Sequence, residues 1–140
     1  MASTARIVAL AATLAFALTA CQPSEASEAS AICGDLANLR ATVAFLEAPP
    51  PTSTVGEVRG DIAKLDSTIG EAQASNAVPD AIGKELGDAR DAYRDVFDGV
   101  GDDDPFSTYA REAAEPARRL GTAFDSVVAV LGCGGSATPA

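Results

Sequence analysis

The chain has 140 residues and a formal net charge of −10 at pH 7, with 20 Asp and Glu against 10 Lys and Arg. This charge excludes nucleic-acid binding, which depends on a basic surface. His is absent, and with it the commonest general base and metal ligand. The sequence also has no catalytic or cofactor-binding motif, so it favours a non-enzymatic protein without a cofactor.

The first segment of the chain is typical of an export signal. Residues 1–6 carry one positive charge, and residues 7–18 are uncharged and apolar. This apolar run is too short to span a bilayer, which needs about 20 residues. It closes with Leu18-Thr19-Ala20-Cys21, in which a small residue directly precedes a cysteine. The motif resembles the lipobox of bacterial lipoprotein precursors.

The resemblance implies that residues 1–20 are a cleaved signal peptide and that Cys21 carries a diacylglyceryl group. The mature protein would then be lipid-anchored on the extracytoplasmic face of the cell membrane, since two or more acyl chains hold a protein stably there. The alternatives are an ordinary signal peptide with an incidental cysteine and a buried apolar helix. The Ala-rich and Asp-rich composition is also similar to that of small helical lipoproteins of high-G+C Gram-positive bacteria, which implies no activity.

Residues 21–30, the lipidated cysteine and the sequence after it, are predicted to be a flexible tether. Their repeated Ser-Glu-Ala pattern contains no large apolar side chain that could pack. Nine such residues have an r.m.s. reach of roughly 15–18 Å. The small and polar residues 134–140 are predicted to be a disordered tail.

Residues 31–133 are predicted to form an all-α four-helix bundle. Apolar residues recur alternately after three and four positions in four stretches, which is the spacing of amphipathic helices. The stretches span residues 32–46, 55–69, 82–100 and 106–131. Because the connections between them are short, neighbouring helices should pack antiparallel in an up-down-up-down order.

Local signals mark the ends of these helices. Thr54 and Glu57 have the spacing of a capping box, and Asp104-Pro105 predicts the N-cap and first residue of the fourth helix. The other signals are the three prolines Pro49 to Pro51 after the first helix, Pro79 in the first turn of the third, and Gly132 after the fourth.

Two features conflict with regular helices. Pro116 lies inside the fourth helix, where it predicts a kink or a break near residues 112–115. Glycines also fall inside helices, at positions 56 and 60 and at positions 83 and 87. We interpret them as tolerated glycines, each costing up to about 1 kcal/mol relative to Ala.

Cys33 and Cys133 are predicted to form a disulfide, because an exported protein folds in an oxidising compartment. In an up-down bundle the start of the first helix and the end of the last lie at the same end, which brings these cysteines together. The chain-entropy model gives such a bond up to about 4.7 kcal/mol of stabilisation. A reactive thiol is the alternative, but neither cysteine lies in a CxxC motif.

The one concentration of charge contains Asp98, Asp102, Asp103 and Asp104. It is only loosely similar to a calcium-binding EF-hand loop, because the closing Glu is missing. A solvated loop is the simpler interpretation, and a weak site for a divalent cation or a basic partner is the alternative. Topology would place this loop beside the proline turn, at the end of the bundle away from the membrane.

We therefore expect an interaction module that binds another component of the cell envelope. The alternative is a small-molecule or metal-ion carrier with an apolar pocket between the helices, near Ala110, Ala113 and Ala117. A pocket above about 300 Å³ would favour the carrier, whereas a filled core would favour the interaction module. Tyr93 and Tyr109 are interpreted as core or core-edge residues.

Overall fold

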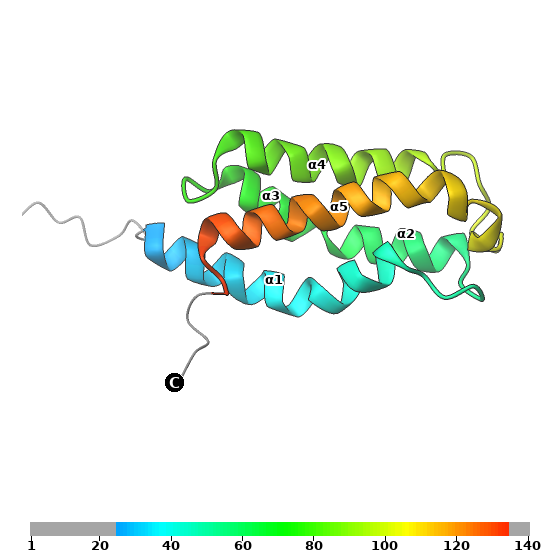
Figure 1. Cartoon of the computed structure of the whole chain (residues 1–140), viewed down its shortest axis with the longest axis horizontal. Coiled ribbons are helices and arrows are strands. Elements are labelled where there is room, and N and C mark those ends of the chain that lie inside the picture. Colours follow the sequence, from blue (N-terminus) through cyan, green and yellow to red (C-terminus); the bar gives the residue numbers. More distant parts are fainter. Residues whose placement is uncertain (1–24, 135–140) are drawn as a thin grey trace, which may run out of the picture.

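The computed structural model describes residues 25–134, so the predicted signal peptide, Cys21 and residues 135–140 lie outside the described residues. The described part is helical and contains no strand, which confirms the predicted all-α class (Figure 1). Its elements are α1 (Glu25–Glu47), α2 (Val55–Lys64), α3 (Asp66–Ala74), α4 (Asp80–Asp95), the short 3₁₀ helix η1 (Phe106–Thr108) and α5 (Ala110–Leu131).

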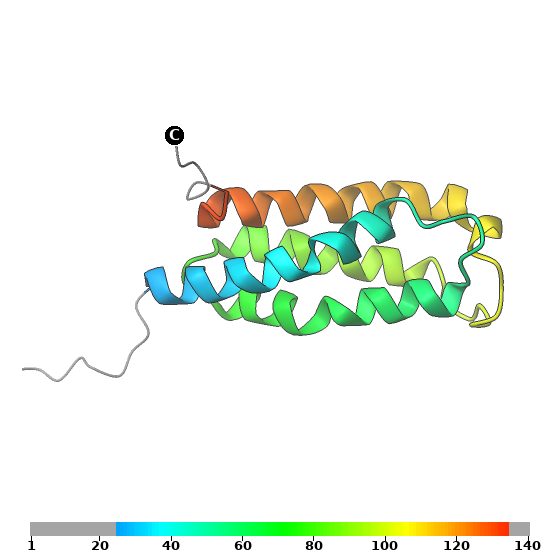
Figure 2. The same cartoon turned by 90° about the horizontal axis from the view of Figure 1, so that it is seen from below.

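The core lies between α1, α4, α5 and the consecutive helices α2 and α3. α5 packs along α4 and α1, and Figures 1 and 2 show it on the opposite side of the core from α2 and α3. Tyr93 is fully buried there and Tyr109 lies at the edge, as predicted. The Tyr93 hydroxyl donates a hydrogen bond of 2.6 Å to the carbonyl of Leu46, and burial raises the pKa of Tyr93.

The first helix starts earlier than predicted. α1 begins at Glu25, so residues 25–30, which we assigned to the tether, are helical. Ala and Glu favour a helix even without a large apolar residue. The added turns also have a tertiary contact, because the Ser75 hydroxyl donates a hydrogen bond of 3.2 Å to the Glu28 carboxylate.

The predicted second helix is divided at Leu65. The N–H of Leu65 donates to the carbonyl of Ile62 at 3.0 Å, the tighter bonding of a 3₁₀ turn. The apolar stretch 55–69 therefore covers α2 and the start of α3, and α3 continues to Ala74. Leu65 is itself buried, so the periodic pattern passes through the break without a gap.

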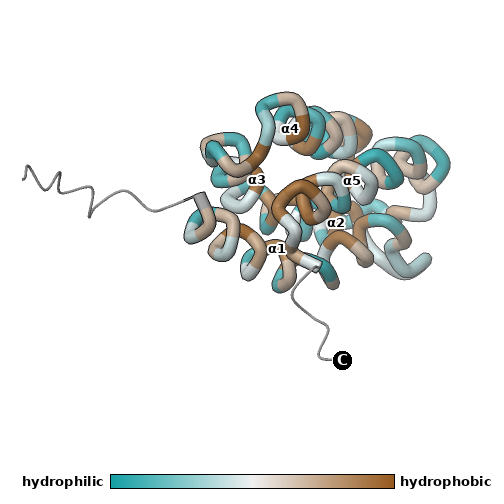
Figure 3. Tube along the Cα trace, turned by 60° about the vertical axis from the view of Figure 1, so that its left-hand side comes forward, coloured by the Kyte–Doolittle hydropathy of each residue, from teal (hydrophilic) through white to brown (hydrophobic). Residues whose placement is uncertain are grey.

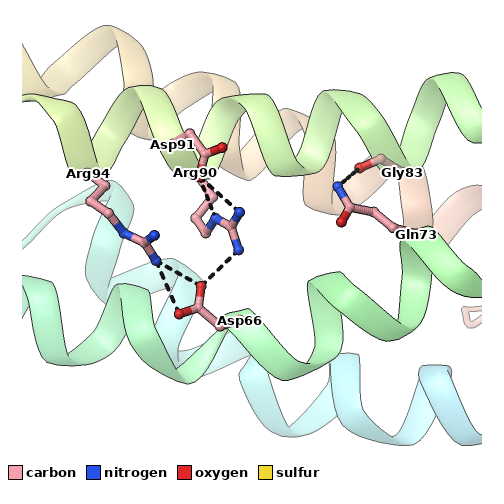
Figure 4. A network of polar contacts seen from close by, with 6 residues as sticks. All are labelled: Asp66, Gln73, Gly83, Arg90, Asp91 and Arg94. Carbon is pink, nitrogen blue, oxygen red and sulfur yellow. Dashed lines mark hydrogen bonds and ion pairs between the residues drawn. The ribbon is translucent and has the colours of Figure 1, made fainter.

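Polar contacts hold α3 against α4 (Figure 4). The Asp66 carboxylate accepts hydrogen bonds from Arg90 at 2.8 Å and from Arg94 at 2.9 Å. Further along, the Gln73 amide donates a hydrogen bond of 3.3 Å to the carbonyl of Gly83. These contacts join α3 to α4 at both ends of α3.

One of the glycines of α4 is more than tolerated. A Cβ placed on Gly83 would lie 3.3 Å from the Cα of Gln73, and one on Gly87 would lie 2.3 Å from the Gln73 amide nitrogen. Both glycines are buried. Gly83 permits the close approach of α3 to α4, so our interpretation of it as merely tolerated is wrong, whereas the atoms nearest Gly87 belong to the flexible Gln73 side chain.

The third helix ends before Val100, the last residue of its apolar stretch. α4 stops at Asp95, and residues 96–99 form turns. Phe97 in these turns is fully buried although it was not among the predicted core positions. Its ring centroid lies 5.7 Å from that of Tyr93 and 6.1 Å from that of Phe106. Pro79, predicted in the first turn of this helix, stands at its N-cap.

The predicted start of the fourth helix at Asp104-Pro105 is wrong. η1 follows Pro105, and α5 begins only at Ala110. The Asp104 carboxylate accepts a hydrogen bond of 3.1 Å from the N–H of Gly101, so it stabilises a turn instead of capping a helix. Backbone hydrogen bonds to α2 hold residues 102–104 as a loop, and only a 3₁₀ turn follows before α5 begins.

α5 continues without a break through Pro116, so of the predicted kink or break near residues 112–115 the break is absent. The helix ends at Gly132, which has a φ of 68°, in the left-handed region that glycine occupies without strain. The proline turn likewise follows the end of α1 at Glu47. Both of these stop signals are confirmed.

The predicted disulfide is confirmed. Cys33 in α1 and Cys133 just after α5 are bonded, with their Cα atoms 5.3 Å apart. The bond closes a loop across a sequence separation of 100 residues. It fixes the start of α1 beside the end of α5.

Replacing both Cys33 and Cys133 by Ala should lower the free energy of unfolding by about 2–5 kcal/mol, because the open chain regains conformational entropy when it unfolds. Urea unfolding followed by circular dichroism measures the change. Adding a reductant to the wild-type protein should reproduce it. An unchanged unfolding free energy would contradict the structural role of this bond.

Candidate functional site

The loops 48–54 and 96–105 meet at the end of the bundle opposite the disulfide, and together we call them the tip (Figures 1 and 2). An isolated bridge joins Thr54 and Pro105, and the N–H of Phe106 donates to the carbonyl of Ser53 at 2.9 Å. The proline turn and the aspartate loop therefore share one end, as the sequence predicted.

The tip is attached to the N-terminus of α2 through backbone hydrogen bonds. The N–H of Val55 donates to the carbonyl of Asp104, and the N–H of Gly56 to that of Asp102, both at 2.9 Å. The first N–H groups of a helix have no partner within the helix, and these carbonyls supply one. The start of α2 is thereby occupied from within the protein.

The predicted capping box at the start of α2 is confirmed. The N–H of Glu57 donates to the Thr54 hydroxyl at 3.3 Å, and the N–H of Thr54 donates to the Glu57 carboxylate at 2.9 Å. Together with the two loop carbonyls, this arrangement satisfies the donors of the first turn of α2. The first turn of α2 is thus fully hydrogen-bonded and holds the aspartate loop in place.

Arg59 is the residue that sequence reasoning missed. Its guanidinium donates hydrogen bonds to the carbonyl of Phe97 and, at 2.7 Å, to that of Val100, and it forms an ion pair with Asp102. Its side chain is 33% exposed, compared with 72% for Asp102. An arginine on the polar side of a helix gives no sequence signal for such a contact. Arg59 therefore holds the loop 96–105 against α2. The sequence had led us to expect a solvated loop without such a contact.

The four predicted site residues take different roles. The Asp102 carboxylate pairs with Arg59, and that of Asp104 accepts the Gly101 N–H. Within the described part of the chain, the carboxylates of the exposed Asp98 and Asp103 have no hydrogen bond or ion pair. Negative charge is thus directed outward at these two positions.

These aspartates do not form a cation site of recognisable geometry. Among residues 25–134, no group of three or more Cys, Asp or Glu side chains is placed to hold a metal ion. Two of the carboxylates, those of Asp102 and Asp104, have partners within the protein, and those of Asp98 and Asp103 face solvent.

A surface groove of about 460 Å³ lies beside the tip, between the proline turn and α2. It is open to solvent, and both polar and apolar side chains line it. Its lining residues are Phe45, Pro50, Thr52, Ser53, Glu57, Gly60, Asp61 and Lys64.

Within residues 25–134, the centre of the bundle is closely packed. The space between the helices that Leu36, Leu86 and Phe124 help to line has a volume of only about 10 Å³, which is at the lower limit for one water molecule. Ala113 and Ala117 are buried against neighbouring side chains, while Ala110 is exposed at the start of α5. The larger grooves that we find are not lined by these alanines.

Comparisons with protein-family models, with curated proteins and with solved structures gave no significant match. Within residues 25–134, no helix has both the length and the apolar character needed to cross a membrane.

Replacing Gly56 by Ala should destabilise the fold by about 1–3 kcal/mol, because overpacking a close contact forces the backbone to move. The added Cβ would lie 2.9 Å from the Cβ of Asp102 and 3.0 Å from its carbonyl oxygen. Gly60 in the same helix has nothing within 4 Å of such an atom. Gly60→Ala should therefore stabilise by about 0.5–1 kcal/mol. Urea unfolding compares the two, and shifts of the same sign would disprove the close contact at Gly56.

Replacing Arg59 by Ala should cost about 1–3 kcal/mol, since two partly buried carbonyls lose their donor. Asp102→Asn should cost less than about 1 kcal/mol, because exposed ion pairs contribute little. Unfolding free energies measure both effects. Arg118→Ala, which removes an exposed pair with Glu115, is the matched control and should change little. Equal losses for Arg59→Ala and Arg118→Ala would contradict the anchoring role of Arg59.

Proposed function

We propose that this protein is a non-enzymatic lipoprotein, anchored through Cys21 on the extracytoplasmic face of the cell membrane, that binds another envelope component at its tip. The filled core carries this proposal, because it supports recognition at the surface over storage of a ligand inside. The lipobox supports the anchor. The alternative of a small-molecule carrier required an internal pocket and gains no support from the structure.

The proposal takes the bundle as antiparallel, in up-down-up-down order with α2 and α3 as one column. The disulfide between Cys33 in α1 and Cys133 just beyond α5 supports this order, as does the hydrogen bond from Ser75, which follows α3, to Glu28 in α1. The contacts of the tip join the opposite ends of the same columns. With Cys21 in the membrane, this topology directs the tip away from the bilayer.

The tip suits a partner with positively charged groups. Asp98 and Asp103 present carboxylates that no internal cation neutralises, while Arg59 keeps the loop in place. A preordered surface loses less conformational entropy on binding than a mobile one. The groove along the proline turn adds apolar contact surface, including Phe45 and Pro50.

The tip is tested by replacing Asp98 and Asp103 with Asn in the membrane-anchored protein. Crosslinking in the cell envelope, followed by mass spectrometry, identifies the partner of the wild type. Loss of two favourable charges should weaken capture by about tenfold or more. Asp80→Asn with Asp125→Asn removes the same charge at the other end of the bundle and should leave capture unchanged.

The anchor is tested in the same cells. Cys21→Ser should abolish metabolic labelling by fatty acids and release the protein from membranes. Unchanged labelling would refute the anchor, whereas equal capture by both aspartate variants would refute the tip as the binding surface.

A further inference from the structure

The end of the bundle opposite the tip is tied closely to the proposed anchor. Because α1 begins at Glu25, only four residue steps separate Cys21 from the first helical residue. Four residues span at most about 14 Å even when fully extended. This step rests on the proposed lipidation of Cys21, and it keeps the start of α1 within that distance of the lipid headgroups.

One groove at this end is lined by uncharged residues, several of them apolar. This groove of about 340 Å³ lies between the first turns of α1 and the end of α5. No charged residue lines it, since its walls are Ala26, Ala29, Ser30, Cys33, Leu131, Gly132 and Cys133. Figure 3, in which this end comes forward, shows hydrophobic residues in the last turns of α5.

Val130 lies next to this groove in the sequence and is the exposed large hydrophobic residue of the described chain, with 43% of its surface accessible. It precedes Leu131, the last residue of α5 and part of the groove wall. The remaining large apolar side chains between residues 25 and 134 are buried or half-buried. Within residues 25–134, the one large hydrophobic residue that is classed as exposed therefore lies at the end nearest Cys21.

We infer that this end, which we call the base (residues 26–33 and 129–133), lies against the bilayer with Val130 at the boundary between headgroups and acyl chains. A short anchor raises the local concentration of the base at the lipid surface, so even a weak apolar contact becomes populated. Val130 and Leu131 provide that contact, and the uncharged groove removes the desolvation cost of a buried charge. Glu28 within the base and Asp125 near it are negatively charged, so the contact should be stronger on zwitterionic than on anionic lipid.

The absence of Trp from the chain provides a direct test. Val130→Trp places a single fluorescent reporter at the base, and Ser107→Trp places the same reporter at an exposed position of η1 beside the tip. Each full-length, lipidated protein is incorporated into phosphatidylcholine vesicles whose acyl chains carry bromine, which quenches Trp at short range. Ala129→Trp, at a neighbouring exposed position, repeats the measurement if Val130→Trp lowers thermal stability.

The Val130→Trp and Ala129→Trp emissions should shift to shorter wavelength and be quenched at least about twofold more than that of Ser107→Trp, as expected for Trp at an interface. Adding anionic lipid should reduce the difference. Equal quenching of base and tip reporters on vesicle-bound protein would overturn the inferred contact while leaving the anchor intact. Failure of the lipid-modified wild type to float with the vesicles would overturn the anchor and the contact together.

Discussion

The N–H groups in the first turn of α2 need partners from outside the helix, and the tip is arranged around them. The carbonyls of Asp102 and Asp104 accept two of these groups, while Thr54 accepts a third through its hydroxyl. Since the two carbonyls belong to a loop more than forty residues away in the sequence, satisfying one helix end also fixes the connection between α4 and α5. Arg59, one turn further along α2, then binds the other side of that loop.

This constraint explains the path of the chain between α4 and α5. Helix α4 ends at Asp95, which lets Phe97 turn inward among the aromatic rings while its carbonyl faces Arg59. The loop can approach α2 closely because Gly56 has no side chain. Asp98 and Asp103 are left on the outer surface as a result of the same path. The exposed charge of the tip therefore follows from the backbone hydrogen bonds between the loop 96–105 and the first turn of α2.

Local patterns predicted those parts of the fold that depend on neighbours in sequence. The three-four spacing gave the helical stretches, and Thr54 with Glu57 gave the start of α2, because both depend on residues within a few positions. The disulfide between Cys33 and Cys133 was predictable because the predicted topology and the predicted export both favour it. The early start of α1, the division at Leu65 and the inward turn of Phe97 depend on tertiary packing. Asp104 was misassigned because its backbone partner lies in α2, and Arg59 was missed because its acceptors are carbonyls, which leave no trace in sequence.

The disulfide at the base has a mechanical consequence. If a partner pulls on the tip while Cys21 holds the lipid, tension runs along the bundle, roughly parallel to the helix axes. Without the bond, this tension would enter through α1 alone and could peel it from its neighbours one turn at a time. The link between Cys33 and Cys133 transfers part of it to α5 after only the first turns of α1. The two helices must then be sheared together, a mode that requires many core contacts to fail at once.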